Sequence, residues 1–132
     1  MNDEDRGKIR NREWASRLKD FSGLRFGKIT PTDIDGFLDF NDQVFIFVEV
    51  KHGASMPQTG QRLALERLCD ACERGGILSL VIIASHCAEG DIYVATLPVT
   101  FIRLKGIWRK PHRPLTVREA IDDFKAWRPN DP

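Results

Sequence analysis

The middle of the chain alternates between apolar and polar positions with the period of a β-strand. In residues 44–51, "VFIFVEVK", every even position is valine or isoleucine, whereas the odd positions begin with two phenylalanines and end with Glu49 and Lys51. Successive side chains of a strand point to opposite faces of the sheet. One face of this strand is therefore apolar throughout, and the other becomes charged at its end.

A second alternating segment, residues 33–40 ("DIDGFLDF"), precedes this strand and is separated from it by the short polar turn "NDQ". Such a connection predicts an antiparallel hairpin. A turn centred on the middle residue of "NDQ" places Asp35 opposite Glu49 and Asp33 opposite Lys51. A slip of one residue would move the aspartates to the apolar face, so the pattern fixes which side chains share a face.

The remaining elements follow from apolar periodicity and from turn residues. A glycine pair ends the central helix, and a capping box of Thr116 and Glu119 begins the last one. The predicted elements are an amphipathic helix over 6–20, a strand over 24–30, a helix over 59–76, a buried strand over 77–85, a strand over 92–99 and a helix over 116–127. This order predicts an α/β fold with an αβββαβ core, a mixed sheet flanked by helices, one additional strand and a C-terminal helix.

The central helix carries an apolar stripe of Leu65, Leu68 and Cys72 at helical spacing, so we expect this side to pack on the sheet. A strand that follows a helix usually joins the earlier sheet in parallel through a right-handed crossover. Residues 77–85 are therefore expected to run parallel to residues 44–51.

The length of 132 residues predicts a single domain over 1–132, with a core over about 6–97 and a basic segment and terminal helix over about 101–128. The net charge of +1 provides no global basic field, so nucleic-acid binding would need a local patch. No apolar run reaches the ~20 residues that cross a bilayer, and the N-terminus lacks an apolar signal core. We expect a cytoplasmic protein without membrane contact.

The three cysteines do not suggest a disulfide framework. Cys69 and Cys72 form a C-x-x-C pair, and His86 with Cys87 could supply two further zinc ligands. A strand of about eight residues, at ~3.3 Å each, would separate the two pairs by roughly 26 Å. Zinc is therefore disfavoured, and the paired cysteines are interpreted as small buried residues.

The pairing of Asp35 with Glu49 brings two carboxylates together on one face. Opposed strand residues have Cβ atoms ~4.5–5.5 Å apart, and like charges there repel. Lys51 offsets part of the repulsion, and a divalent cation would offset more of it. Mg²⁺ is commonly held by one or two carboxylates together with water and phosphate, so these residues suit metal-assisted phosphodiester hydrolysis. The alternative is a solvated hairpin end with no chemical role.

"DIDG" followed by "FVEVK" resembles the PD-(D/E)XK nuclease superfamily, which includes restriction enzymes and Holliday-junction resolvases. The resemblance implies a restriction-endonuclease-like αβββαβ core and a Mg²⁺-dependent nuclease, in which Mn²⁺ can substitute. It implies metal binding by Asp35 and Glu49 and assistance by Lys51. Pro31 is displaced from the motif position, so Asp33 is a second candidate for the metal aspartate.

Two further positions follow from the same resemblance. Some members of the superfamily supply a metal-binding glutamate from the first helix, which here implies Glu13. Others place a catalytic glutamine on the helix after the lysine strand, which implies Gln61. Gln61 continues the predicted apolar stripe toward the helix start, so it should point at the sheet near Glu49. Both residues also have ordinary explanations, as an exposed helical glutamate and a helix-terminal polar residue.

A basic segment around Trp108 is the best candidate for contact with nucleic acid, because cations neutralise phosphates and an aromatic ring can stack on a base. The alternative is a solvated loop with the tryptophan covering the core. The expected contacts are His52, Arg62, Arg103, Lys105, Trp108, Arg109, Lys110 and Arg113.

The expected function is therefore hydrolysis of nucleic acid, with DNA as the expected polymer. The competing hypothesis is a catalytically inactive nuclease fold that binds DNA or a protein partner. A chain this small has little surface for both a duplex and a separate specificity element, so we also expect a homodimer.

Overall fold

The computed structural model describes residues 17, 20–53 and 55–127, which fall into two units that divide between Asp33 and Ile34. The described part of the first unit contains the short 3₁₀ helix η2 (Ser22–Leu24) and a single β-bridge between Phe26 and Ile29. The strand predicted over 24–30 is therefore wrong. Gly27 has a φ of 63°, and the chain reverses there instead of extending. Most of the helix predicted over 6–20 lies outside the described residues.

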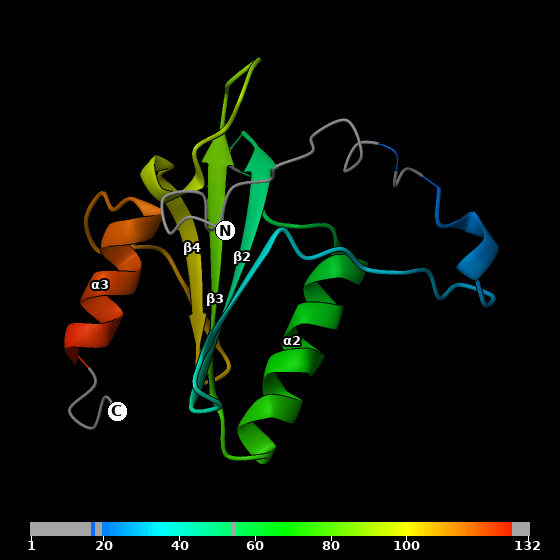
Figure 1. Cartoon of the computed structure of the whole chain (residues 1–132), viewed down its shortest axis with the longest axis horizontal. Coiled ribbons are helices and arrows are strands. Elements are labelled where there is room, and N and C mark those ends of the chain that lie inside the picture. The colour runs from blue at the N-terminus through cyan, green and yellow to red at the C-terminus, as the bar shows by residue number, and fades with distance from the viewer. Residues whose placement is uncertain (1–16, 18–19, 54, 128–132) are drawn as a thin grey trace, which may run out of the picture. The chain divides into compact units, whose positions relative to one another are not determined.

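The second unit is built on a five-stranded mixed sheet in the order β1-β2-β3-β4-β5. Only β2 and β3 pair in parallel, and the other neighbours are antiparallel. Figure 1 shows helix α2 on one side of this sheet and helix α3 on the other. The α/β fold is thus confirmed. The strands are β1 (Gly36–Phe40), β2 (Val44–His52), β3 (Leu78–His86), β4 (Val99–Leu104) and β5 (Ile107–Arg109), and the helices are α2 (Thr59–Arg74) and α3 (Val117–Trp127).

The hairpin of β1 and β2 has the predicted register, with Phe37 opposite Phe47. Its turn places Asn41 and Asp42 at φ values of 56° and 63°, a left-handed conformation that asparagine and aspartate tolerate best. The Asp42 N–H also donates to Asp39 Oδ1 at 2.8 Å. Local turn chemistry thus fixes the pairing that brings the odd-numbered side chains onto one face.

Helix α2 returns the chain for the parallel pairing of β3 with β2, as predicted. Its buried residues are Leu65 and Cys69, whereas Leu68 is 37% exposed. The predicted stripe of Leu65, Leu68 and Cys72 was therefore misplaced. The true stripe repeats every four residues and begins at Gln61.

The strand predicted over 92–99 is also wrong. The chain instead forms the 3₁₀ helix η3 (Val94–Thr96), and β4 begins only at Val99. The Thr96 hydroxyl donates to the Tyr93 carbonyl at 2.9 Å, a local bond that competes with strand pairing. Pro98 lacks an N–H, so it cannot donate to a sheet ladder.

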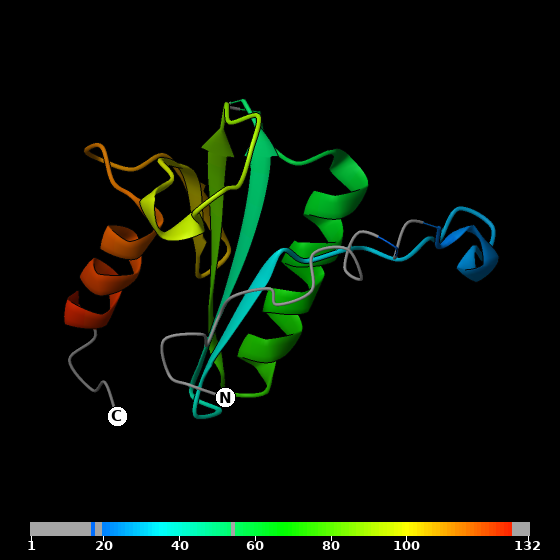
Figure 2. The ribbon, with the colours of Figure 1, turned by 45° about the horizontal axis from the view of Figure 1, so that its top comes forward.

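The two faces of the sheet bury separate apolar clusters. Even-numbered residues of β2 and β3 pack with α3, and odd-numbered residues pack with α2. Figure 2 shows the two helices on either side of the central strands. The strand parity of the sequence therefore assigns each residue of β2 to one helix layer. No helix in the described part of the chain is long and apolar enough to span a membrane.

The capping box of α3 provides a test of this local folding. The Glu119 N–H donates to Thr116 Oγ1 at 3.1 Å, and the Thr116 N–H donates to a Glu119 carboxylate oxygen at 3.0 Å. We predict that Thr116→Ala lowers the free energy of unfolding by about 1 kcal/mol, because it leaves a helix N–H without its acceptor. Thr116→Ser retains the hydroxyl and should unfold like the parent in urea. Equal stability of all three proteins would contradict this role.

Candidate active site at the end of strand β2

Glu49 is a buried carboxylate on an otherwise apolar strand. It follows Phe47 on the face of β2 that α2 covers, and only 3% of its surface is exposed. Its Oε2 atom is buried and has no hydrogen-bond partner among the described residues. A buried carboxylate oxygen without a partner is costly, so this position needs a proton or a cation.

Asp35 reaches the same point from the hairpin partner strand. The backbone ladder of the hairpin ends at Gly36, opposite Val48. One residue earlier, Asp35 Oδ2 accepts a hydrogen bond from the Val50 N–H at 2.8 Å. The side chain of Asp35 thus accepts the hydrogen bond of a β2 backbone N–H that no residue of β1 reaches. It is itself exposed, so it joins the buried Glu49 to solvent.

Lys51 and Gln61 complete the constellation. The Lys51 Nζ atom lies 3.7 Å from Glu49 Oε1 and donates a hydrogen bond to Gln61 Oε1 at 2.5 Å. Gln61 lies in the first turn of α2, one turn before the buried Leu65. The start of α2 stands beside the end of β2 in Figure 1. The connection from β2 to α2 therefore brings Gln61 within hydrogen-bonding distance of Lys51.

The electrostatics of this cluster raise the pKa of Glu49 from 4.5 to about 7. Burial is the largest cause, and the neighbouring Asp35 carboxylate adds to it. A hydrogen bond from Gln61 and the charge of Lys51 act in the opposite direction. Near neutral pH the Glu49 carboxyl therefore occurs in both its protonated and its ionised form.

The side chains that could hold a metal here are Asp35 and Glu49. The N–H and C=O of a strand residue point to the same neighbour, so the Val50 carbonyl faces the same edge as its N–H and offers a third oxygen. The described residues contain no group of three or more histidine, cysteine, aspartate and glutamate side chains placed to bind a metal. Two carboxylates completed by water and phosphate are typical of Mg²⁺ sites and not of zinc sites.

Two further candidate metal residues, Asp33 and Glu13, stay predictions. Asp33 belongs to the first unit. Glu13 lies outside the described residues. The three cysteines considered as zinc ligands differ in exposure, because Cys69 is buried, Cys72 is half-buried and Cys87 is exposed.

Two of the predicted nucleic-acid contacts lie at the end of the sheet that carries the site. His52 is the exposed last residue of β2, and its ring packs edge-to-face on His86 with centroids 5.2 Å apart. Its even number places it on the opposite face from Glu49. Arg62 follows Gln61 in the first turn of α2 and is half-buried. Both positions are near the constellation in sequence and in the fold.

The basic segment does not form one surface. Arg103 is buried and its guanidinium donates to Asp70 at 2.9 Å, while the Trp108 indole donates to Glu66 at 2.7 Å. Arg103 and Trp108 are directly opposed in the β4–β5 ladder. They therefore attach this hairpin to α2 and are not available as a phosphate-binding patch.

The other cations of this segment lie elsewhere. Lys105 and Arg109 line a groove beside α3, and Arg113 pairs with Asp123 of α3 at 2.6 Å. Lys110 lines the same groove. Sequence reasoning missed the acidic partners on α2, although Glu66 and Asp70 are four residues apart and share a side of the helix.

The raised pKa of Glu49 predicts an unusual dependence of stability on pH. The unfolded chain ionises Glu49 near 4.5, whereas the folded protein ionises it near 7. Between these values the unfolded state binds fewer protons, so the free energy of unfolding falls as pH rises. The full loss is roughly 3 kcal/mol and is complete above the folded pKa.

Glu49→Gln removes this titrating group, so we expect its free energy of unfolding to vary less between pH 4.5 and 7 and to exceed that of the parent at pH 8. Urea unfolding at several pH values measures both effects. Glu89→Gln changes an exposed carboxylate and is the matched control. A parent protein whose stability rises through this window, with no difference in Glu49→Gln, would contradict the assignment.

Comparisons with known proteins do not identify a family for this chain. No protein-family model matches it. No curated protein and no solved structure matches it either. The resemblance to the PD-(D/E)XK superfamily therefore stays a prediction from the sequence motif and the predicted order of elements.

Proposed function

We propose that this protein is a metal-dependent nuclease that hydrolyses phosphodiester bonds in nucleic acid, with DNA as the expected substrate. The observation that carries the proposal is the environment of Glu49. Its Oε2 atom is buried without a partner, Asp35 lies beside it, and the Lys51 ammonium is 3.7 Å from its other oxygen. Structural carboxylates are normally solvated or fully paired, and this one is neither.

The residues fit a magnesium ion. Asp35 and Glu49 would hold it, with the Val50 carbonyl on the same edge. When bound, the ion supplies Lewis acidity to a phosphate oxygen and lowers the pKa of a coordinated water. Ionisation of Glu49 then becomes favourable, because the repulsion from Asp35 is replaced by attraction to the cation.

Lys51 is positioned to act on the substrate. Its side chain is 25% exposed, so its ammonium group can contact both the buried carboxylate and a phosphate that approaches from solvent. The hydrogen bond to Gln61 fixes the direction of the Nζ atom. In this arrangement Lys51 stabilises the charge that develops on the phosphate, and Gln61 is a positioning residue.

The binding surface for nucleic acid is expected around the same end of the sheet. Arg62 follows Gln61 in the first turn of α2 and is half-buried, and His52 is the exposed residue that follows Lys51 in β2. Either could contact a phosphate next to the one that is cleaved. Arg103 and Trp108 are excluded from this part of the proposal, because their polar groups already bind Asp70 and Glu66.

The test is a substrate panel of branched, linear and single-stranded DNA together with RNA, in Mg²⁺ or Mn²⁺. We expect cleavage of at least one polymer. Asp35→Asn, Glu49→Gln and Lys51→Met should each lower its rate by about 100-fold or more, since removing a single electrostatic group from an active site commonly has this effect. Glu89→Gln is the matched control and should cleave like the parent. Nucleic-acid binding without cleavage would favour the inactive module instead.

Metal binding should compete with the proton on Glu49. Below the Glu49 pKa of about 7, we expect the affinity for Mn²⁺ to rise about tenfold per pH unit, because each ion displaces one proton. Above that pKa the affinity for Mn²⁺ should no longer change with pH. Isothermal titration calorimetry between pH 5.5 and 8.5 measures the profile. An affinity independent of pH, or unchanged in Glu49→Gln, would show that the ion does not bind this carboxylate.

A further inference from the structure

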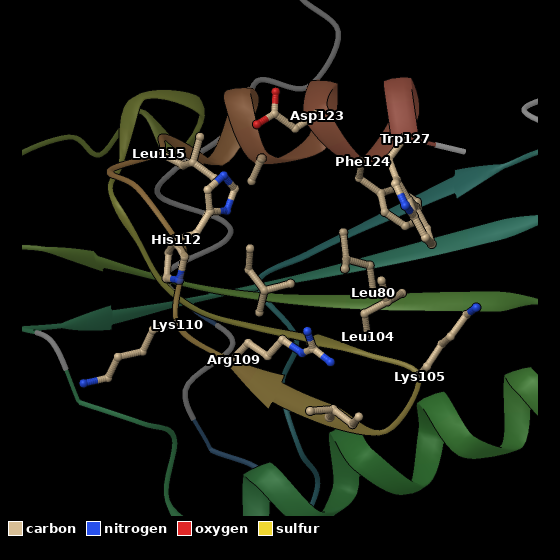
Figure 3. Close-up of a pocket in the computed structure, with 14 residues that line it drawn as sticks. Leu80, Leu104, Lys105, Arg109, Lys110, His112, Leu115, Asp123, Phe124 and Trp127 are labelled. Carbon is tan, nitrogen blue, oxygen red and sulfur yellow. The ribbon is translucent and has the colours of Figure 1, made fainter. Parts of the chain in front are cut away.

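A groove of about 820 Å³ lies on the face of the sheet opposite to Glu49. Figure 3 shows it between α3 and the β4–β5 hairpin, with Leu80 and Leu104 on its floor. Its residues are not part of the proposed active site. The groove therefore calls for an explanation of its own.

The floor of the groove is the uncovered side of the last two strands. Ile102 and Leu104 are the even-numbered residues of β4, on the α3 side of the sheet. Residues directly opposed in a ladder point to the same face, so Ile107 joins Leu104, and Arg109 joins Ile102. Ile107 is 51% exposed. Ile107 is therefore the aliphatic residue of this floor that is most open to solvent, beside the half-buried Ile102 and Leu104.

One wall of the groove is a complete stripe of α3. Ala120, Asp123, Phe124 and Trp127 all line it, at spacings of three and four residues that place them on one side of the helix. Trp127 is 56% exposed, although its ring packs against Phe124 with centroids 5.9 Å apart. Ala120 and Phe124 are buried, so α3 exposes Asp123 and Trp127 to the groove.

The dimensions of the groove match a second helix beside α3. Five strands at ~4.8 Å spacing span about 19 Å, whereas a helix with side chains is about 10 Å across. The cluster that α3 joins includes residues of β2, β3 and β4 but none of β5, so α3 covers only part of this width. Packed helices have axes about 8–10 Å apart. The strip over β5 and the outer side of β4 is therefore left for one more helix.

The charged residues around the groove indicate which charges a helix bound there should carry. Lys105, Arg109, Lys110 and His112 line the groove. The rim charge comes from Lys105 and Arg109, because the Lys110 ammonium lies 6.0 Å from the ring centroid of Phe101 on the α2 side of the sheet. Asp123 is the acidic residue among the described lining residues, and Arg113 already neutralises it at 2.6 Å. An aliphatic floor with a basic rim attracts a segment that is apolar on one side and acidic at its flanks.

We propose that this groove is the docking site for an amphipathic helix of a partner protein, with an apolar stripe against Leu104 and Ile107 and acidic residues against the basic rim. Recognition of this kind uses apolar side chains spaced by three and four residues. The described long helices of the chain itself, α2 and α3, already bury their apolar sides on the sheet. The proposal is independent of the nuclease activity.

The test measures binding of a fluorescein-labelled 14-residue helical peptide to the full chain by anisotropy. The probe has leucines at positions i, i+3, i+4 and i+7, flanking glutamates, and glutamine elsewhere. We expect saturable binding that is at least tenfold tighter than that of the same peptide with lysine in place of glutamate. Ile107→Glu, and separately the pair Lys105→Glu and Arg109→Glu, should each weaken it at least tenfold.

Matched controls come from the opposite face of the sheet. Leu68→Glu and Arg67→Glu change exposed residues of α2 and should leave peptide binding unchanged. Circular dichroism shows whether each variant keeps its fold. Equal binding of the two peptides, or no effect of Ile107→Glu, would overturn the proposal.

The same variants distinguish the partner helix from two other occupants of the groove, a lipid surface and a second copy of the chain. Failure of the acidic peptide, with Ile107-dependent binding of anionic phosphatidylglycerol vesicles, would assign the groove to a lipid surface and overturn the proposal. Self-association in sedimentation velocity that Ile107→Glu abolishes would assign it to a second copy of the chain and also overturn it. A monomeric protein that binds the acidic peptide alone supports it.

Discussion

The burial of β2 and β3 on both faces is the constraint on which the rest of the structure depends. Each residue of β2 must suit either the α2 layer or the α3 layer, and almost all of them are aliphatic or aromatic. Glu49 is the exception in this strand, because its carboxylate is covered like its apolar neighbours. A charge in such a place is stable only when something outside the apolar cluster compensates it. Asp35, Lys51 and Gln61 supply only part of that compensation.

The cluster therefore lowers the stability of the folded protein at pH values above the pKa of Glu49. Burial of the carboxylate and its repulsion by Asp35 are the two largest causes. Lys51 and Gln61 favour the ionised form of Glu49. They do not outweigh burial and the repulsion from Asp35, since the pKa of Glu49 remains raised to about 7. Perturbed carboxylates in such a setting are more common at functional sites than elsewhere. A proton or a cation at Glu49 relieves the same repulsion.

The two faces of the sheet use polar residues in different ways. On the α2 side, Arg103 donates to Asp70 and Trp108 donates to Glu66, so these polar groups attach the last strands to the helix. On the α3 side, the cations remain at the rim of an apolar groove. Basic residues that are adjacent in sequence thus have unrelated roles, because neighbours on a strand point in opposite directions.

The sequence by itself determined the local features: strand parity, the hairpin register, the central helix, and the capping box at Thr116. These depend on interactions between residues close in the chain, so periodicity and turn residues specify them. It also determined that Asp35, Glu49 and Lys51 share a face. Only the tertiary structure decided that Gln61 meets Lys51, that Arg103 is buried against Asp70, and that residues 92–99 turn instead of extending. Those outcomes depend on which distant segments pack together, and no local pattern encodes the packing of α2 against β4 and β5.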